Sequence, residues 1–210
     1  MTTLSLPFRE RLASDFCINR LKIAKRLASS VDDTVKYLYE LPDGNYVETV
    51  CMQYHHGTSL CISTQVGCRM GCRFCASAIA GFVRNLTPAE MLLQIYETER
   101  AQNCKICSLV LMGIGEPLDN FDNVLRFLQL LSDPNGYGMS LRHVTVSTCG
   151  VVPKILELAE QRLGLTLSGS LHCPNDAGRS AIMPINRSYP IDVLLDACQT
   201  YFEKTGRRVT

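Results

Sequence analysis

Alternation of apolar and polar positions is clearest between residues 35 and 52, where it predicts two strands that each bury one face. Val35, Tyr37 and Tyr39 alternate along the first strand, and residues 46–52 form the returning strand. Leu-Pro-Asp-Gly at 41–44 supplies a tight turn between them, so this segment is predicted to be a β-hairpin. Ahead of the hairpin, a short helix is suggested by Leu21, Ile23, Ala24 and Leu27.

From about Ser59 onward, short apolar runs alternate with segments of helical period, which is typical of βα units around a parallel sheet. Strands are predicted over 60–64, 108–112, 143–147 and 165–171, and helices over 87–102, 121–131, 152–162 and 190–204. Thr87 to Glu90 reads as a capping box, and Gly206 is placed to end the last helix. Residues 207–210 begin a predicted fifth strand. We therefore expect an α/β protein, with an N-terminal part (1–55) and a core domain (56–210).

Composition and charge narrow the possible classes of protein. With 210 residues, 46% of them hydrophobic, the chain can bury a sizeable core in one domain. No apolar run approaches the roughly 18 residues that a membrane span needs, and the N-terminus lacks the apolar core of a signal peptide. The net charge of +1 gives no broad basic field. Positive charge is densest in residues 1–30, where a solvated helical face is the commoner explanation.

Three closely spaced cysteines, Cys68, Cys72 and Cys75, form a C-x3-C-x2-C run. Electron-carrying [4Fe–4S] clusters usually take four cysteines, so three ligands predict a cluster with one open iron, where substrate chemistry can occur. A zinc site is the alternative, although zinc normally closes its tetrahedron with a fourth ligand. The other eight cysteines are scattered, which favours a reducing cytosol over a disulfide framework. Cys104 and Cys107 lack partners at zinc-like spacing and are interpreted as structural.

The same cysteine run lies in LCISTQVGCRMGCRFCASAIAGFVRNL, and this stretch resembles a known family. MGIGEPLDN, VTVSTCGVVPKI, SLHCPND and MPINRSYPID follow in the family's order. They identify the chain, from about Thr34 to Thr210, as similar to the radical S-adenosylmethionine enzymes that methylate C2 of adenine in 23S ribosomal RNA and in certain transfer RNAs. That family folds as a partial barrel of six βα units. The resemblance implies that this chain holds about four of them and is a fragment without the C-terminal part.

The resemblance also assigns roles to residues. It implies that the three clustered cysteines hold the [4Fe–4S] cluster and that S-adenosylmethionine is lined by Gly115, Glu116, Ser147, Ser170, Leu171 and His172. Glycine at 115 would allow close approach of the cofactor to the backbone, and a dinucleotide fingerprint is the weaker interpretation because the third glycine is missing. The matched motifs all fall at the carboxyl ends of predicted strands, where barrel active sites gather.

Two catalytic roles are implied as well. Cys61 matches a cysteine that resolves a covalent RNA–protein adduct through a transient disulfide, although a buried strand cysteine is commonly just a small hydrophobe. Glu48 matches the family's proton acceptor, although a glutamate on a hairpin is usually solvated.

The implied reaction is radical methylation. Electron transfer from the cluster cleaves S-adenosylmethionine to a 5′-deoxyadenosyl radical, which acts on a methylated cysteine of the C-terminal segment. The resemblance implies 23S rRNA and tRNA as substrates, an electron donor such as flavodoxin, no membrane, a monomer and a cytoplasmic location. No cysteine here matches the methyl carrier, so the 210-residue chain is expected not to methylate RNA. The alternatives are the related adenine-C8 methyltransferase of antibiotic resistance and a non-catalytic iron–sulfur or zinc-binding module.

Overall fold

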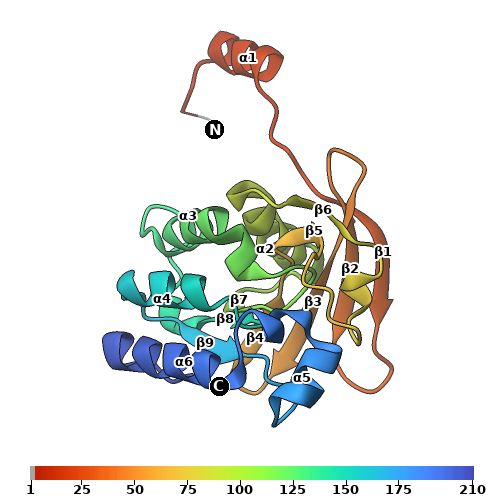
Figure 1. Ribbon diagram of the computed structural model, residues 1–210. Coiled ribbons are helices and arrows are strands. Elements are labelled where there is room, and N and C mark those ends of the chain that lie inside the picture. Colours follow the sequence, from red (N-terminus) through yellow and green to blue (C-terminus); the bar gives the residue numbers. More distant parts are fainter. Residues whose placement is uncertain (1–2) are drawn as a thin grey trace.

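A single curved sheet organises the molecule in this computed structural model, which describes residues 3–210 (Figure 1). Its strand order is β1-β2-β3-β4-β7-β8-β9. The first four strands are antiparallel neighbours, whereas β4, β7, β8 and β9 run parallel. The bounds are β1 (Lys22–Ala28), β2 (Val35–Glu40), β3 (Tyr46–Tyr54), β4 (Gly57–Cys61), β7 (Ile106–Leu111), β8 (Val144–Thr148) and β9 (Thr166–Gly169). The predicted hairpin and the parallel βα core are both confirmed.

Helices cover the outer side of the parallel strands, as Figure 1 shows. They are α2 (Pro88–Gln102), α3 (Phe121–Ser132), α4 (Val152–Glu160) and α6 (Ile191–Thr205). The capping box at the start of α2 is confirmed: Thr87 Oγ1 accepts from the Glu90 amide at 3.2 Å, and the Glu90 carboxylate accepts from the Thr87 amide at 2.9 Å. Gly206 ends α6 with φ 64°, as predicted. Val209 forms a parallel bridge to Leu167, where a fifth strand was expected.

The predicted helix over residues 21–27 is wrong. These residues form β1, which pairs with β2 with a register shift between Ile23 and Lys25. Its side chains are all exposed, so burial of an apolar helix face does not decide the conformation. The free edge of β2 instead supplies backbone partners, which a local pattern cannot reveal. The N-terminal helix is α1 (Leu6–Asp15), which stands away from the sheet in Figure 1 and buries no residue.

The core lies between the sheet and its helices. Tyr37 and Tyr39 of β2 are fully buried, and the Tyr39 hydroxyl lies 2.8 Å from Thr98 Oγ1 of α2. β3 and β4 join the same sheet directly, so the predicted boundary between residues 55 and 56 falls in the turn between two hydrogen-bonded strands. The division into 1–55 and 56–210 remains a prediction, and residues 1–2 lie outside the described residues. Between residues 3 and 210, no helix combines the length and hydrophobicity that crossing a membrane requires.

Three further differences from the prediction lie around the cysteine run. A small two-stranded sheet, β5 (Gln65–Gly67) with β6 (Phe82–Asn85), flanks the cysteine run. A short helix, α5 (Asp176–Ile182), follows β9. In addition, β4 ends at Cys61, short of the predicted end at Thr64, because the chain then turns into β5. All three changes affect the position of the cysteine loop.

Candidate functional site

A cavity of about 320 Å³ opens at the carboxyl ends of β7, β8 and β9. The cysteine loop forms one wall, the β7 exit loop another, and the ends of β8 and β9 the third. Of the residues singled out from the sequence, the cavity brings together Cys68, Cys72, Cys75, Gly115, Glu116, Ser147, Ser170 and His172. Four segments that are distant in sequence therefore share one pocket. A larger hollow of about 750 Å³ lies between β9 and α6 and includes none of the three clustered cysteines.

The cysteine loop connects β5 to β6, and its two ends are pinched together at glycines. A Cβ atom at Gly67 would lie 1.7 Å from the Gly81 carbonyl oxygen, so no side chain fits there. The Cys68 amide donates to that same carbonyl at 3.1 Å. On its other side the loop is held by α5, because the Arg73 amide donates to the Ile182 carbonyl at 2.9 Å. The loop is therefore held at its base and at its middle by the protein itself.

Arg69 of this loop is not among the residues that line the cavity and pairs with the β7 exit loop. Its Nε atom lies 2.9 Å from Asp119 Oδ2, and its guanidinium lies 3.8 Å from the centre of the Phe82 ring. Asp119 also accepts from Gln65 Nε2 at 2.7 Å. This arginine therefore ties the loop to its neighbours.

Gln65 is the buried centre of that connection. Its Oε1 atom accepts from the Glu116 amide at 2.9 Å, and its Nε2 atom donates to Asn85 and to Asp119. Gly115 has φ +110°, and a Cβ atom there would lie 2.6 Å from Gln65 Cβ and 2.8 Å from the Gln65 nitrogen. Glycine at 115 is thus required by packing against Gln65. The sequence had suggested only that glycine gives a cofactor room.

Glu116 is buried and joins two strand ends. One carboxylate oxygen accepts from the Leu118 amide at 3.0 Å and the other from the Cys149 amide at 2.8 Å. Burial raises the pKa of Glu116, and these backbone donors oppose the increase. The carboxylate therefore holds the β7 exit loop against the end of β8 while it lines the cavity.

His172 has an unusual backbone at the end of β9, with φ 56°. Its ring packs on Phe74 of the cysteine loop, with 4.6 Å between ring centres. A non-glycine residue in the left-handed region is uncommon and suggests a functional constraint. The strained turn thus presents His172 to the cysteine loop across the mouth of the cavity.

The thiols of the cysteine loop are partly buried. Burial raises the pKa of Cys68 to about 11, and burial also raises the pKa of Cys72. Iron binding must therefore displace protons from these thiols. Within residues 3–210, no three Cys, His, Asp or Glu side chains converge closely enough to hold one metal ion. A lone zinc ion needs such convergence, whereas each cysteine of a cubane cluster binds a different iron. The donor set fits a cluster better than it fits zinc.

Three predicted site residues lie outside the cavity. The Leu171 side chain lines the hollow beside α6. Cys61 ends β4, where burial raises its thiol pKa and the backbone of Met112, a cavity residue, opposes the increase. Glu48 of β3 pairs with Lys36 at 2.6 Å and lines a separate small pocket of about 230 Å³ beside residues 76–81. All eleven cysteines are free, so the expected disulfide of Cys61 is not formed in the structure.

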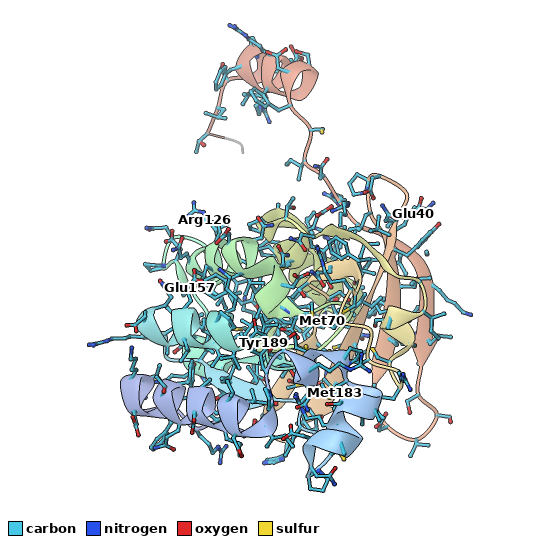
Figure 2. All side chains as sticks on the ribbon, in the orientation of Figure 1. Glu40, Met70, Arg126, Glu157, Met183 and Tyr189 are labelled. Atoms are coloured by element: carbon cyan, nitrogen blue, oxygen red, sulfur yellow. The ribbon has the colours of Figure 1, made fainter. Side chains whose placement is uncertain are left out.

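Sequence analysis missed several residues that line the cavity. They are Met70, Phe74, Leu111, Met112, Gly113, Pro117, Thr148, Cys149 and Met183. Figure 2 labels Met70 of the cysteine loop and Met183, which follows α5, so the reader can locate two of these positions. Most of these residues lie in or beside a recognised motif, so their position in the sequence could have added them to the predicted site. Met183 begins the recognised motif MPINRSYPID, but its place at the cavity depends on α5, which was not predicted.

Comparison with known proteins adds independent information about this site. The Radical SAM superfamily model matches residues 62–210, which include the cysteine loop and every strand end of the cavity. The chain belongs to the Radical SAM superfamily. The expected fold class is confirmed by this match and by the parallel sheet. The superfamily implies a [4Fe–4S] cluster and S-adenosylmethionine as cofactors.

Curated relatives of this superfamily member match over its whole length. It is 51% identical to a probable dual-specificity RNA methyltransferase RlmN of Lachnoclostridium phytofermentans and 52% identical to one of Finegoldia magna. Each match covers 100% of this chain but only 59% and 60% of the relative, respectively. A crystal structure of a radical SAM methyltransferase from Sphaerobacter thermophilus matches with a TM-score of 0.92 and 39% identity. That match covers 99% of this chain and 62% of the solved one.

Proposed function

We propose that this chain is the core of a radical S-adenosylmethionine RNA methyltransferase that methylates C2 of adenine, at adenosine 2503 of 23S rRNA and adenosine 37 of tRNA. One observation carries the proposal: the three cysteines share a cavity with side chains from the ends of three parallel strands. The names of the relatives supply the substrate class. An electron donor such as flavodoxin and a cytoplasmic location are part of the proposal.

The residues that line the cavity are consistent with the two cofactors in the proposal. Cys68, Cys72 and Cys75 would hold the cluster, and no fourth cysteine lies in the loop to close its coordination. Ser147, Ser170 and His172 offer polar groups from the β8 and β9 ends for S-adenosylmethionine. Leu171 would contribute through its backbone, because its side chain faces another hollow. When bound, the cluster supplies the single electron that cleaves S-adenosylmethionine reductively.

Glu48 and Cys61 take roles around this cavity in the proposal. Glu48 is half-exposed and would accept a proton from the substrate, with Lys36 holding its carboxylate at 2.6 Å. Its pocket includes residues of the segment 76–81, directly after the third cysteine, which supports a nucleotide lying between β3 and the loop. Cys61 would act as the resolving thiol, and contact with the Met112 backbone supports its closeness to the cavity.

Anaerobic reconstitution with iron and sulfide tests the cofactor part. We expect about four iron and four sulfide per chain and a brown colour, which Cys68→Ala, Cys72→Ala and Cys75→Ala each abolish. Cys104→Ala is the matched control, since Cys104 lies outside the cavity and should leave the colour intact. One zinc per chain, or colour that survives all three loop variants, would contradict the cluster.

The proposal that RNA is the substrate needs a second assay, which contains reductant, labelled S-adenosylmethionine and unmodified 23S rRNA or tRNA. Methyl groups at C2 of adenine would support the proposed function and contradict the expectation that this chain does not methylate RNA, whereas methyl groups at C8 would support the antibiotic-resistance relative. Release of 5′-deoxyadenosine without methylated RNA would support the radical chemistry and is the result expected of this chain, because none of its cysteines matches the methyl carrier. No release of 5′-deoxyadenosine from protein with an intact cluster would contradict the proposal. Where methylated RNA is detected, Glu48→Gln should lower its amount and leave the iron content unchanged, because Glu48 lies outside the cavity.

A further inference from the structure

Arg179 of α5 is fully buried and has no direct counterion. Its guanidinium donates to the carbonyl oxygens of Cys149 (2.6 Å), Ser170 (3.2 Å) and Leu171 (3.2 Å), and to the side-chain oxygen of Asn186 (2.6 Å). Every one of these acceptors is neutral. Burying a charge without an opposite charge is costly, so the arrangement requires an explanation.

The guanidinium lies directly behind the cavity wall. Two of its acceptors belong to Cys149 and Ser170, which line the cavity. The charged and titratable groups around it are Asp176 on its own helix, Cys72 across the cavity, and Cys149 with the Glu116 carboxylate on its amide. Burial lowers the pKa of Arg179, while Cys149, Cys72 and Asp176 oppose that decrease. Arginine nevertheless stays protonated in proteins, so a full positive charge lies behind the cavity wall, near enough to interact with the thiols of Cys72 and Cys149.

Arg179 also fixes the parts that surround the cluster loop. It fastens the end of β8 to the end of β9, and its own helix carries the Ile182 carbonyl that receives the Arg73 amide. A Cβ atom at Gly150 would lie 3.3 Å from the guanidinium, which shows how closely the strand end is packed on it. Neither a lysine nor a neutral residue could make all four contacts, because only arginine presents five N–H donors in one plane.

We infer that Arg179 is the internal counterion of the iron–sulfur cluster, a positioning residue whose charge raises the reduction potential of the cluster. This inference rests on the cluster assignment in the proposed function. Three thiolates and the cluster core give an anionic group, and reduction adds one more negative charge. A fixed positive charge in a partly desolvated wall stabilises the reduced form more than the oxidised form. The cost of burying the guanidinium is thereby offset when the cluster is bound.

The test is a potentiometric titration of the reconstituted protein, followed by the electron paramagnetic resonance signal of the reduced cluster. In Arg179→Gln, which is neutral but still donates, the ratio of reduced to oxidised cluster at a fixed potential should fall about tenfold, or ~59 mV for one electron. Asn186→Ala is the matched control: it removes one acceptor of the same network and keeps the charge, so the potential should stay unchanged. If Arg179→Gln does not fold, Arg179→Met takes its place.

The outcomes separate the two proposals. A lower potential in the neutral variant but not in Asn186→Ala supports the counterion role. Equal potentials in wild type and Arg179→Gln, with only iron content reduced, would overturn it and leave Arg179 as a structural clamp. Equal decreases in Arg179→Gln and Asn186→Ala would likewise overturn it, since network geometry would then set the potential. Failure of the wild-type protein to form any cluster would contradict the proposed function instead.

Discussion

Gly115→Ala should lower the stability of the protein far more than the same substitution at an exposed glycine, because Gly115 packs directly against Gln65. The new Cβ atom would lie 2.6 Å from Gln65 Cβ and 2.8 Å from the Gln65 nitrogen, and neither atom can swing aside. Overpacking of this kind costs about 1–3 kcal/mol, and φ +110° adds strain on the order of 1–3 kcal/mol. We expect the free energy of unfolding to fall by roughly 2–6 kcal/mol, a large share of typical domain stability.

Chemical denaturation followed by circular dichroism measures this loss. Gly138→Ala is the matched control, because Gly138 also has a positive φ (+74°) but nothing within 4 Å of its Cβ position. It should lose only the backbone strain, about 1 kcal/mol. The iron content of Gly115→Ala after reconstitution should fall as well, since Gln65 begins the strand that leads into Cys68. Equal losses of stability in the two variants would refute the packing explanation.

Two further predictions concern surface networks. Thr87→Ala removes one half of the capping box on α2 and should lower the free energy of unfolding by about 1 kcal/mol, measured by urea denaturation; an unchanged midpoint would contradict this. The Arg84 guanidinium, 2.7 Å from Asp43, holds the pKa of that carboxyl well below its usual range. Its stabilisation, about 0.5–1 kcal/mol after solvent screening, is present above the ordinary carboxyl pKa of about 4 and decreases as pH falls below it. Asp43→Asn should therefore differ from wild type more at pH 6 than at pH 2.

Short sequence motifs predicted the helix ends that are fixed by contacts between residues close together in the chain. The start of α2 was predictable because Thr87 and Glu90 satisfy each other's amides within one turn, and Gly206 ends α6 for a comparable reason. The strand at 22–28 was not predictable, because its conformation depends on the open edge of β2 rather than on its own apolar pattern. A single sequence does not show which distant segments pair with one another in a sheet.

The candidate site likewise contains residues that the sequence could predict and residues that it could not. Residues at strand ends, such as Ser147 and Ser170, reached the cavity because parallel strands present their carboxyl ends at one edge. Leu171, adjacent to one of them, did not, because successive residues point to opposite faces. Arg179 gave no signal at all in the sequence: its importance comes from acceptors directly after β8, directly after β9 and in the segment after α5.

The contact between Gly67 and Gly81 has a consequence for the assembly of the cluster. Closing a flexible loop lowers conformational entropy, and a ligand that must close the loop itself loses binding free energy. Here folding has already joined the two ends, through β5, β6 and the hydrogen bond from Cys68 to Gly81. Incoming iron therefore meets thiols at a high effective concentration and has only the interior of the loop to arrange. A side chain at Gly67, which would collide with the Gly81 carbonyl, would transfer that entropic penalty from folding to metal loading.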